Sequence, residues 1–211
     1  PLEILKNIPW LSDIDQQVFR KVLYSFQNNL FSVGENLIKN KRPGSEIIII
    51  LRGTVKVTFN NKVCDLLGPG DVIGEISVLT GLPRTATVTA ESPVSALKLS
   101  DNVLRTLFIE IPELKERLWK VAAQRFAENL LKDKKEYTSG SLIELREKIL
   151  KGEVIQLKKS DKFFPAGDVL ILLEGAIIDA DNNNIRYSGV RLMPSEQHYI
   201  ADKDSRIFVI K

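Results

Sequence analysis

The chain has 211 residues, enough for one large or two small domains, and its 44% share of hydrophobic residues is sufficient to form their cores. Its 30 basic and 27 acidic residues are interspersed and give a net charge of +3, which is typical of a solvated surface and argues against nucleic-acid binding. One cysteine and one histidine exclude an intrachain disulfide and a zinc site built from thiolates and imidazoles, so we expect a reducing compartment and no metal.

No segment of the sequence is apolar enough to cross a membrane. The longest aliphatic runs, residues 47–51 and 169–173, are far shorter than the roughly 20 residues that span a bilayer. We therefore expect this stretch of chain to be soluble. It begins at Pro1 instead of Met and lacks a signal-peptide pattern, which indicates a piece cut from a longer protein.

The first expected element is a short amphipathic helix. Ser12 to Asp15 predict a capping box, and apolar residues then recur at helical spacing, at Val18, Phe19, Val22, Leu23 and Phe26. From Phe31 to Leu99 the sequence changes to short runs of Val, Ile, Leu and Thr separated by glycines. Many short strands with a glycine at nearly every turn predict a β-roll or jelly-roll barrel.

Helical spacing returns after Ser100. Pro112 suits the first position of a helix. An apolar stripe follows it, formed by Leu114, Leu118, Val121, Ala122, Phe126 and Leu130. The charged and polar residues 132–140 predict a linker, and residues 141–150 predict one more helix.

The tail from Val154 returns to strand-like runs, and part of it repeats the texture of the first half. When Gly53 is aligned with Gly175, residues 45–61 match residues 167–183. Both have an acid, five aliphatic residues, a charged residue, the glycine, an alternating run and two asparagines. This indicates a degenerate second β-roll, although any apolar strand followed by a glycine turn has the same look.

The segment from Gly74 to Ala86, GEISVLTGLPRTA, contains the candidate ligand-binding residues, and their types suit a cyclic nucleotide. Such a ligand presents one phosphate charge, a ribose 2′-hydroxyl and a flat base, and each needs its own partner in the protein. Gly74 allows close approach of the backbone to the sugar-phosphate, and Glu75 is suited to accept the ribose hydroxyl's hydrogen bond. The backbone amides of Ile76 and Ser77 point at the phosphate if they open a helical turn.

Arg84 is the candidate countercharge for the phosphate, because the guanidinium fork matches a pair of phosphate oxygens. Thr85 adds a hydroxyl donor for the phosphate or for the exocyclic amine of guanine. The alternative is that Glu75 and Arg84 form an ordinary ion pair in a barrel that has lost its ligand. We expect no catalytic residue and no enzyme activity, and we interpret His198 as structural or surface-exposed.

From about Leu5 to Leu131 the sequence resembles the cyclic-nucleotide-binding domain family. The opening helix, VGENLIKN, LRGTVKV, LGPGDVIGE, the segment above and the trailing helices follow the family's order. The resemblance implies cAMP or cGMP as ligand, with Glu75 on the ribose and Arg84 on the cyclic phosphate. It also implies a base lid on the trailing helix, with Trp119 and Phe126 as candidates, although aromatic residues on such a stripe are more often core. Dimerisation is common in the family, so a homodimer is a further expectation.

The Arg-Thr pair at 84 and 85 is similar to the version in nucleotide-gated channels and cGMP-dependent kinases, which favours cGMP. Bacterial transcription regulators of the family place a helix-turn-helix after the long helix, but Val154 to Lys211 shows strand-like runs instead. No nucleic-acid partner is therefore expected.

The tail resembles the cytoplasmic region of plasma-membrane Na+/H+ antiporters of the plant salt-overly-sensitive type, through WKVAAQRFAENLL, VLILLEGAIID and QHYIADKDSRIFVIK. Those proteins largely lack the Glu and Arg that this chain keeps. The resemblance implies a covalently attached transmembrane transport domain and a place on the cytoplasmic face of a membrane.

The sequence therefore predicts a mainly β chain with α-helices. Residues 1–137 form a double-stranded β-helix, or jelly roll, with flanking helices, and residues 138–211 form a helix and a smaller β-rich domain. The expected function is cyclic-nucleotide control of an attached transporter. The alternatives are a bacterial cyclic-nucleotide-responsive transcription regulator and an interaction module that has lost its ligand.

Overall fold

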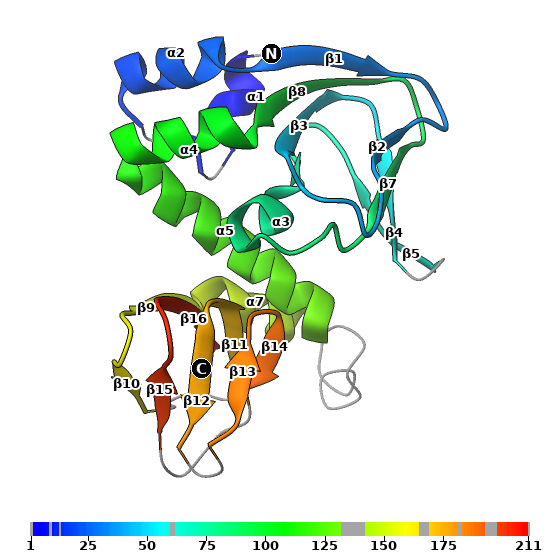
Figure 1. The fold of residues 1–211 in the computed structure, drawn as a ribbon. Helices are drawn as coiled ribbons and strands as arrows, with labels where there is room; N and C mark the ends of the chain where they lie inside the picture. The colour runs from blue at the N-terminus through cyan, green and yellow to red at the C-terminus, as the bar shows by residue number, and fades with distance from the viewer. Residues whose placement is uncertain are drawn as a thin grey trace. The chain divides into compact units, whose positions relative to one another are not determined.

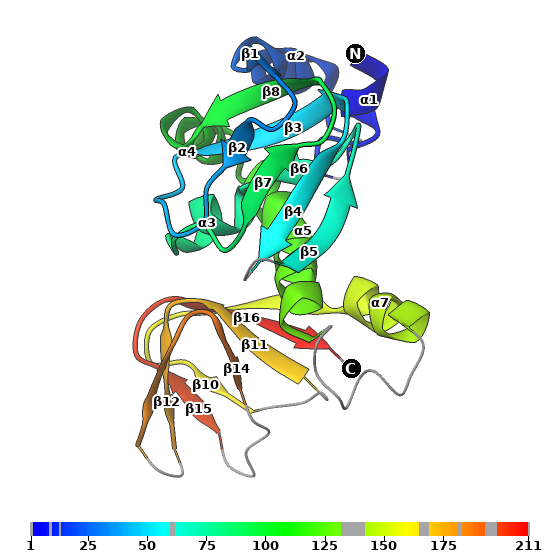
Figure 2. The same ribbon diagram turned by 90° about the vertical axis from the view of Figure 1, so that its right-hand side faces the viewer.

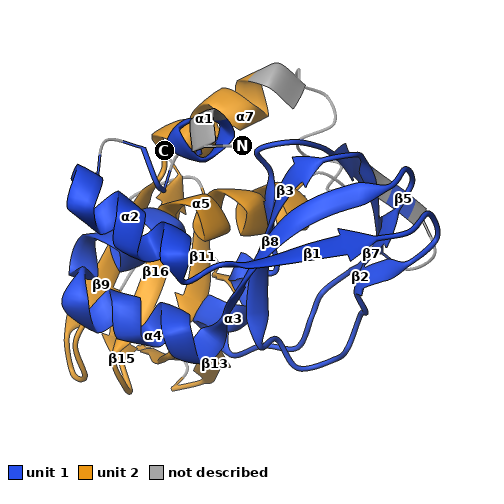
Figure 3. Cartoon of the chain, turned by 90° about the horizontal axis from the view of Figure 1, so that it is seen from above, with its two compact units in different colours: residues 1–118 blue, residues 119–211 orange. Residues whose placement is uncertain are grey.

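The computed structural model describes residues 2–8, 10–12, 14–59, 62–131, 142–164, 169–180, 183–192 and 198–210. They form two compact units, unit 1 (residues 1–118) and unit 2 (residues 119–211), as Figure 3 shows. The boundary falls inside helix α5 (Pro112–Leu131). The expected linker at 132–140 and the expected boundary at 137 lie outside the described residues, so the division at 137 stays a prediction. None of the helices in the described ranges is long and apolar enough to cross a membrane.

Unit 1 consists of two four-stranded antiparallel sheets with the strand orders β1-β8-β3-β6 and β2-β7-β4-β5 (Figures 1 and 2). Its strands are β1 (Gln27–Phe31), β2 (Asn36–Ile38), β3 (Glu46–Arg52), β4 (Val55–Phe59), β5 (Lys62–Leu67), β6 (Val72–Ile73), β7 (Thr87–Ala90) and β8 (Val94–Ser100). Its helices are α1 (Leu2–Lys6), α2 (Gln16–Tyr24), α3 (Glu75–Thr80), α4 (Asp101–Glu110) and the first part of α5. This confirms the jelly roll with flanking helices.

The core of unit 1 lies between its sheets, and strand β3 is buried on both faces. Ile48 and Ile50 point into a cluster with residues of both sheets, and the alternate residues Ile47 and Ile49 are also fully buried. The opposite face of this sheet is therefore covered as well, and α4 contacts β8. Burial on both faces explains why β3 is an unbroken aliphatic run instead of an alternating one.

Two helices of unit 1, α2 and α4, begin at short polar side chains. The Asp15 side chain accepts hydrogen bonds from the backbone N–H groups of Gln17 (2.8 Å) and Val18 (3.3 Å), so Asp15 is the N-cap of α2. The capping box predicted from Ser12 is therefore wrong, because the aspartate lies closer to the first free amides of the helix. The helix predicted after Ser100 is confirmed, and Ser100 is the N-cap of α4.

Unit 2 contains helix α7 (Leu142–Lys151) after the end of α5, followed by eight strands in two antiparallel sheets. The strand orders are β9-β16-β11-β14 and β10-β15-β12-β13, which repeat those of unit 1. The strands are β9 (Glu153–Leu157), β10 (Lys162–Phe163), β11 (Val169–Glu174), β12 (Ala176–Asp179), β13 (Ile185–Tyr187), β14 (Val190–Leu192), β15 (Tyr199–Ala201) and β16 (Ser205–Ile210). The predicted second β-roll is confirmed.

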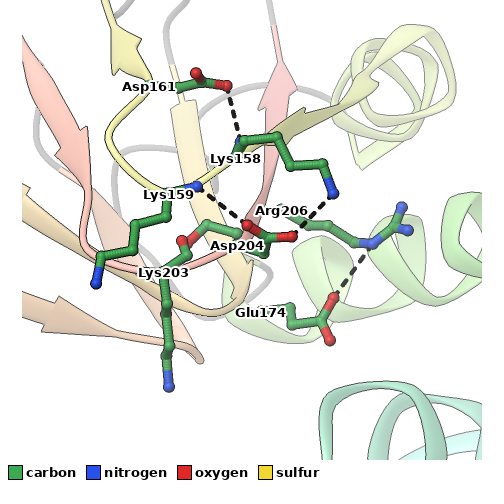
Figure 4. Close-up of polar contacts among 8 residues, drawn as sticks. Lys158, Lys159, Asp161, Glu174, Lys203, Asp204 and Arg206 are labelled. Carbon is green, nitrogen blue, oxygen red and sulfur yellow. Dashed lines mark hydrogen bonds and ion pairs between the residues drawn. The ribbon is translucent and has the colours of Figure 1, made fainter.

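A polar network ties two turns of unit 2 together (Figure 4). The Asp204 carboxylate accepts hydrogen bonds from Lys158 Nζ (2.9 Å) and from the backbone N–H of Lys159 (3.0 Å). The bond with Lys158 lowers the pKa of Asp204 and raises the pKa of Lys158. Because the pKa of Asp204 is lowered on folding, its contribution to stability is present at neutral pH and is lost as the pH falls through that lowered value.

Gly53 and Gly175 occupy the same place in the two rolls, where the chain leaves one sheet and enters the other. Both have positive φ, +88° and +97°. A Cβ on Gly53 would lie 2.3 Å from the carbonyl oxygen of Pro93, and a Cβ on Gly175 would lie 2.6 Å from that of Asp204. The left-handed conformation and the backbone contact together require glycine at both crossings.

We expect Gly53→Ala to destabilise unit 1 by more than about 3 kcal/mol, because it adds a backbone clash to a left-handed φ. Gly34→Ala is the matched control, since Gly34 has φ +83° but a Cβ there meets nothing within 4 Å. It should cost about 1 to 2 kcal/mol, the conformational penalty alone. Urea unfolding, with hydrogen exchange of peptides from β3 and β8, would measure the free energy of unfolding of unit 1 in both variants. Equal decreases in the two variants would show that the contact with the Pro93 carbonyl does not matter.

Candidate functional site

The segment from Gly74 to Ala86 connects β6 to β7 and begins with the short helix α3. Glycines in the left-handed conformation flank this helix, Gly74 (φ +88°) before it and Gly81 (φ +71°) after it. The residues that follow lead into β7, whose Val88 and Ala90 are buried. The two glycines therefore separate a compact helical turn from the strands on either side.

Arg84 is buried and joins three segments through its guanidinium. Its Nη1 donates hydrogen bonds to the carbonyl oxygen of Gly74 (2.7 Å) and to Ser77 Oγ (2.8 Å). Its Nη2 donates to the carbonyl oxygen of Glu46 (2.6 Å), at the start of β3. The side chain thus fixes the first turn of α3 against the start of β3.

The main chain of Arg84 is held as well. Its N–H donates to the carbonyl oxygen of Arg42 (2.8 Å), and its carbonyl oxygen accepts from the N–H of Lys41 (2.8 Å). These bonds pair the loop before β7 with the loop between β2 and β3. Arg84 is therefore positioned by both its backbone and its side chain, which leaves the guanidinium little freedom to turn away.

Two glycines leave the room that this guanidinium needs. A Cβ on Gly74 would lie 2.3 Å from Arg84 Nη1, and a Cβ on Gly44 would lie 2.3 Å from Ser77 Oγ and 3.3 Å from Arg84 Cζ. The observed close neighbour of Gly74 is the arginine, and the approach of its backbone to a sugar-phosphate stays a prediction. Gly44 was missed at the sequence level, because a glycine in an exposed loop carries no signal of what the fold brings to it.

The electrostatics of the site come from one buried cation and two neighbouring acids. Burial lowers the pKa of Arg84, and the negative charges of Glu46 and Glu75 oppose that shift. Glu75 is itself buried at the first position of α3. Guanidinium does not lose its proton in proteins, so Arg84 remains a desolvated positive charge. Such a charge favours an anion that reaches it.

The other predicted site residues divide into those near Arg84 and the two candidate lid residues. Near Arg84, Glu75, Ile76 and Ser77 are buried on α3, and Thr85 is exposed at the next position in the chain. Together with Gly74 and Arg84, they form one cluster.

The two candidate lid residues belong to unit 2. Trp119 is fully buried, with the Arg206 guanidinium 5.0 Å from its ring centre, and Phe126 is half-buried. Their role as a lid stays a prediction. The His198 ring packs against that of Phe164, with centroids 5.3 Å apart. Within the described ranges, no group of three or more His, Cys, Asp and Glu side chains is arranged to hold a metal.

Comparisons with known proteins agree on unit 1. Residues 29–110 match the family model of the cyclic nucleotide-binding domain. A CRP-like cAMP-activated global transcriptional regulator of Mycobacterium tuberculosis is 27% identical over 128 residues, 58% of this chain and 57% of that protein. A cyclic nucleotide-gated potassium channel of Mesorhizobium japonicum is 28% identical over 123 residues, 58% of this chain and 34% of the channel. The match thus covers less than two thirds of either relative.

A solved structure of the regulatory domain of Toxoplasma gondii PKA with cAMP has a TM-score of 0.52 and 16% identity. It covers 100% of this chain and 87% of its own, so the shared fold includes both units. None of the three proteins named here is an antiporter, and the resemblance of the tail to antiporters stays a prediction.

We expect Ser77→Ala to destabilise unit 1 by about 1.5 to 3 kcal/mol, because it removes an acceptor from a buried, charged donor. Ser92→Ala is the control. Its hydroxyl accepts from the Thr54 N–H (2.9 Å) at an exposed position, so its loss should cost less than about 1 kcal/mol. Urea unfolding of both variants without ligand measures the difference. Similar losses would argue that Arg84 does not depend on the Ser77 hydroxyl.

Proposed function

Because residues 29–110 match the family model of the cyclic nucleotide-binding domain, we propose that unit 1 binds cAMP or cGMP and serves as a regulatory domain. The observation that carries the proposal is the buried Arg84 guanidinium, whose three hydrogen-bond partners are all uncharged oxygens. These bonds use three of the five N–H donors of an arginine. A cyclic phosphate supplies the negative charge that these partners do not.

The other residues of the cluster have complementary roles in this proposal. The Ile76 and Ser77 amides, in the first turn of α3, donate to the phosphate, and the Glu75 carboxylate accepts from the ribose 2′-hydroxyl. Thr85 is exposed next to Arg84 and offers its hydroxyl to the phosphate or to the exocyclic amine of guanine. Trp119 and Phe126 remain the candidates for a lid over the base.

Binding has a regulatory effect only if the nucleotide prefers one of two conformations of the protein. Without ligand, Arg84 ties the segment from Gly74 to Ala86, here called the cassette, to Glu46 at the start of β3. A phosphate that recruits the same guanidinium competes with that contact. The nucleotide therefore favours a conformation in which the segment from Gly74 to Ala86 has moved relative to β3.

The output that we propose is control of a covalently attached membrane transporter, with this chain on the cytoplasmic face. The resemblance of the tail to plant Na+/H+ antiporters supports this output, and one relative of unit 1 is an ion channel. A transcription regulator is the alternative, supported by the mycobacterial relative. After α7, however, the described residues form strands instead of a helix-turn-helix. A homodimer is compatible with either output.

We expect Arg84→Ala to weaken binding of cAMP and cGMP by about tenfold to hundredfold, since a hydrogen bond to a charged group contributes about 1.5 to 3 kcal/mol. Arg84→Lys should lose less, because it keeps a point charge but not the fork. Arg52→Ala, which removes an exposed arginine at the end of β3, is the matched control and should bind normally.

Isothermal titration calorimetry of each variant with each nucleotide measures these affinities, and circular dichroism checks that the variants are folded. If the unmodified chain gives no heat and no thermal shift at millimolar nucleotide, the sensor function is wrong. The interaction module without a ligand then replaces it.

A further inference from the structure

The two rolls of this chain share one architecture, strand for strand. The pairs β1–β8, β8–β3 and β3–β6 of unit 1 have the counterparts β9–β16, β16–β11 and β11–β14 in unit 2. The pairs β2–β7, β7–β4 and β4–β5 correspond in the same way to β10–β15, β15–β12 and β12–β13. Each strand of unit 2 can therefore be assigned to one strand of unit 1 without reference to sequence identity.

The first turn of each roll confirms this assignment at the level of single hydrogen bonds. The N–H of Gly34 donates to the carbonyl oxygen of Ala90 (2.8 Å), and the N–H of Ser160 donates to that of Ala201 (2.7 Å). Both turn residues have positive φ, +83° and +73°. Ser160 thus occupies the position of Gly34, and β15 that of β7.

The turn before the cassette also has a counterpart. The N–H of Gly70 donates to the carbonyl oxygen of Ile50, and the N–H of Gly189 donates to that of Leu172, both at 2.8 Å. The φ values of the two glycines are +94° and +92°. The strands and turns of the two rolls therefore correspond as far as β6 and β14. In unit 1, the segment that contains the candidate site follows directly after β6.

At this point the two rolls differ. Thirteen residues, 74–86, connect β6 to β7, and they contain α3, Glu75 and Arg84. Only six residues, 193–198, connect β14 to β15, with the sequence MPSEQH and no arginine. Unit 1 uses ten residues, 75–84, for α3 and the return to Arg84, which is more than the whole connection in unit 2 contains.

We infer that unit 2 takes no cyclic nucleotide, so that one chain with two rolls holds one nucleotide, at Arg84. The inference rests on the proposed function of unit 1 and adds its stoichiometry. It also leaves the second roll available for a different task, which its contact with α5 indicates. The Arg206 guanidinium lies over the Trp119 ring of α5, and its Nε lies 3.2 Å from a Glu174 carboxylate oxygen.

Further contacts attach α5 to unit 2. Gln124 Nε2 donates to the carbonyl oxygen of Leu150 (3.4 Å), and Arg146 pairs with Glu128 (3.7 Å). Unit 2 therefore holds the second half of the helix whose first half belongs to unit 1.

Native mass spectrometry and equilibrium dialysis of the intact chain with saturating cAMP, and separately cGMP, count the nucleotides bound per chain. We expect one per chain in the unmodified protein. In Arg84→Ala, we expect no site with the original affinity. Arg186→Ala, which removes an exposed arginine from β13 of unit 2, is the matched control and should leave the count at one.

Two nucleotides per chain would overturn the inference and leave the proposed function of unit 1 intact. A single site that keeps its original affinity in a folded Arg84→Ala variant would place the nucleotide elsewhere and overturn both. No binding of either nucleotide to the unmodified chain would overturn the proposed function, and the one-site count with it. The count on the unmodified chain decides between one and two sites even if Arg84→Ala fails to fold.

Discussion

Both rolls depend on a crossing at which the chain leaves one sheet and enters the other with no space for a side chain. Gly53 and Gly175 make these crossings with positive φ, each against a carbonyl of the hairpin that leads into the last strand of its roll. The buried strand before each glycine pairs with the last strand of its roll, β3 with β8 and β11 with β16. A register shift follows in both pairs next to the glycine, which shows the same local geometry imposed twice.

On this common frame the cassette is an addition, since unit 2 completes its two sheets with a much shorter connection at the same place. One buried arginine joins this addition to β3, and a desolvated guanidinium is costly unless acceptors surround it. Carbonyl oxygens of Gly74 and Glu46 and the Ser77 hydroxyl meet that need without a ligand. None of these three contacts carries a full negative charge, so in the proposed function the guanidinium still attracts an anion.

The two β-rolls could be predicted from the sequence because the patterns that indicate them are local. Aliphatic runs that end in glycine predicted the strands of both rolls, and the matching residue types around Gly53 and Gly175 predicted that the rolls correspond. The sequence did not predict the partners of Arg84, because backbone carbonyls are present in every residue and only the fold selects those of Gly74 and Glu46. The N-cap was misplaced for a similar reason, since Ser12 and Asp15 are both good caps and the path of the chain decides between them.

The inference that only unit 1 binds a nucleotide restricts how a signal can leave that unit. If only unit 1 responds to nucleotide, the free energy of binding must change contacts inside that unit before anything reaches unit 2. Helix α5 is continuous across the boundary between the units. In its second half, Trp119 lies under the Arg206 guanidinium and Gln124 donates to the carbonyl oxygen of Leu150. Helix α5 is therefore the connection through which the proposed signal would leave unit 1.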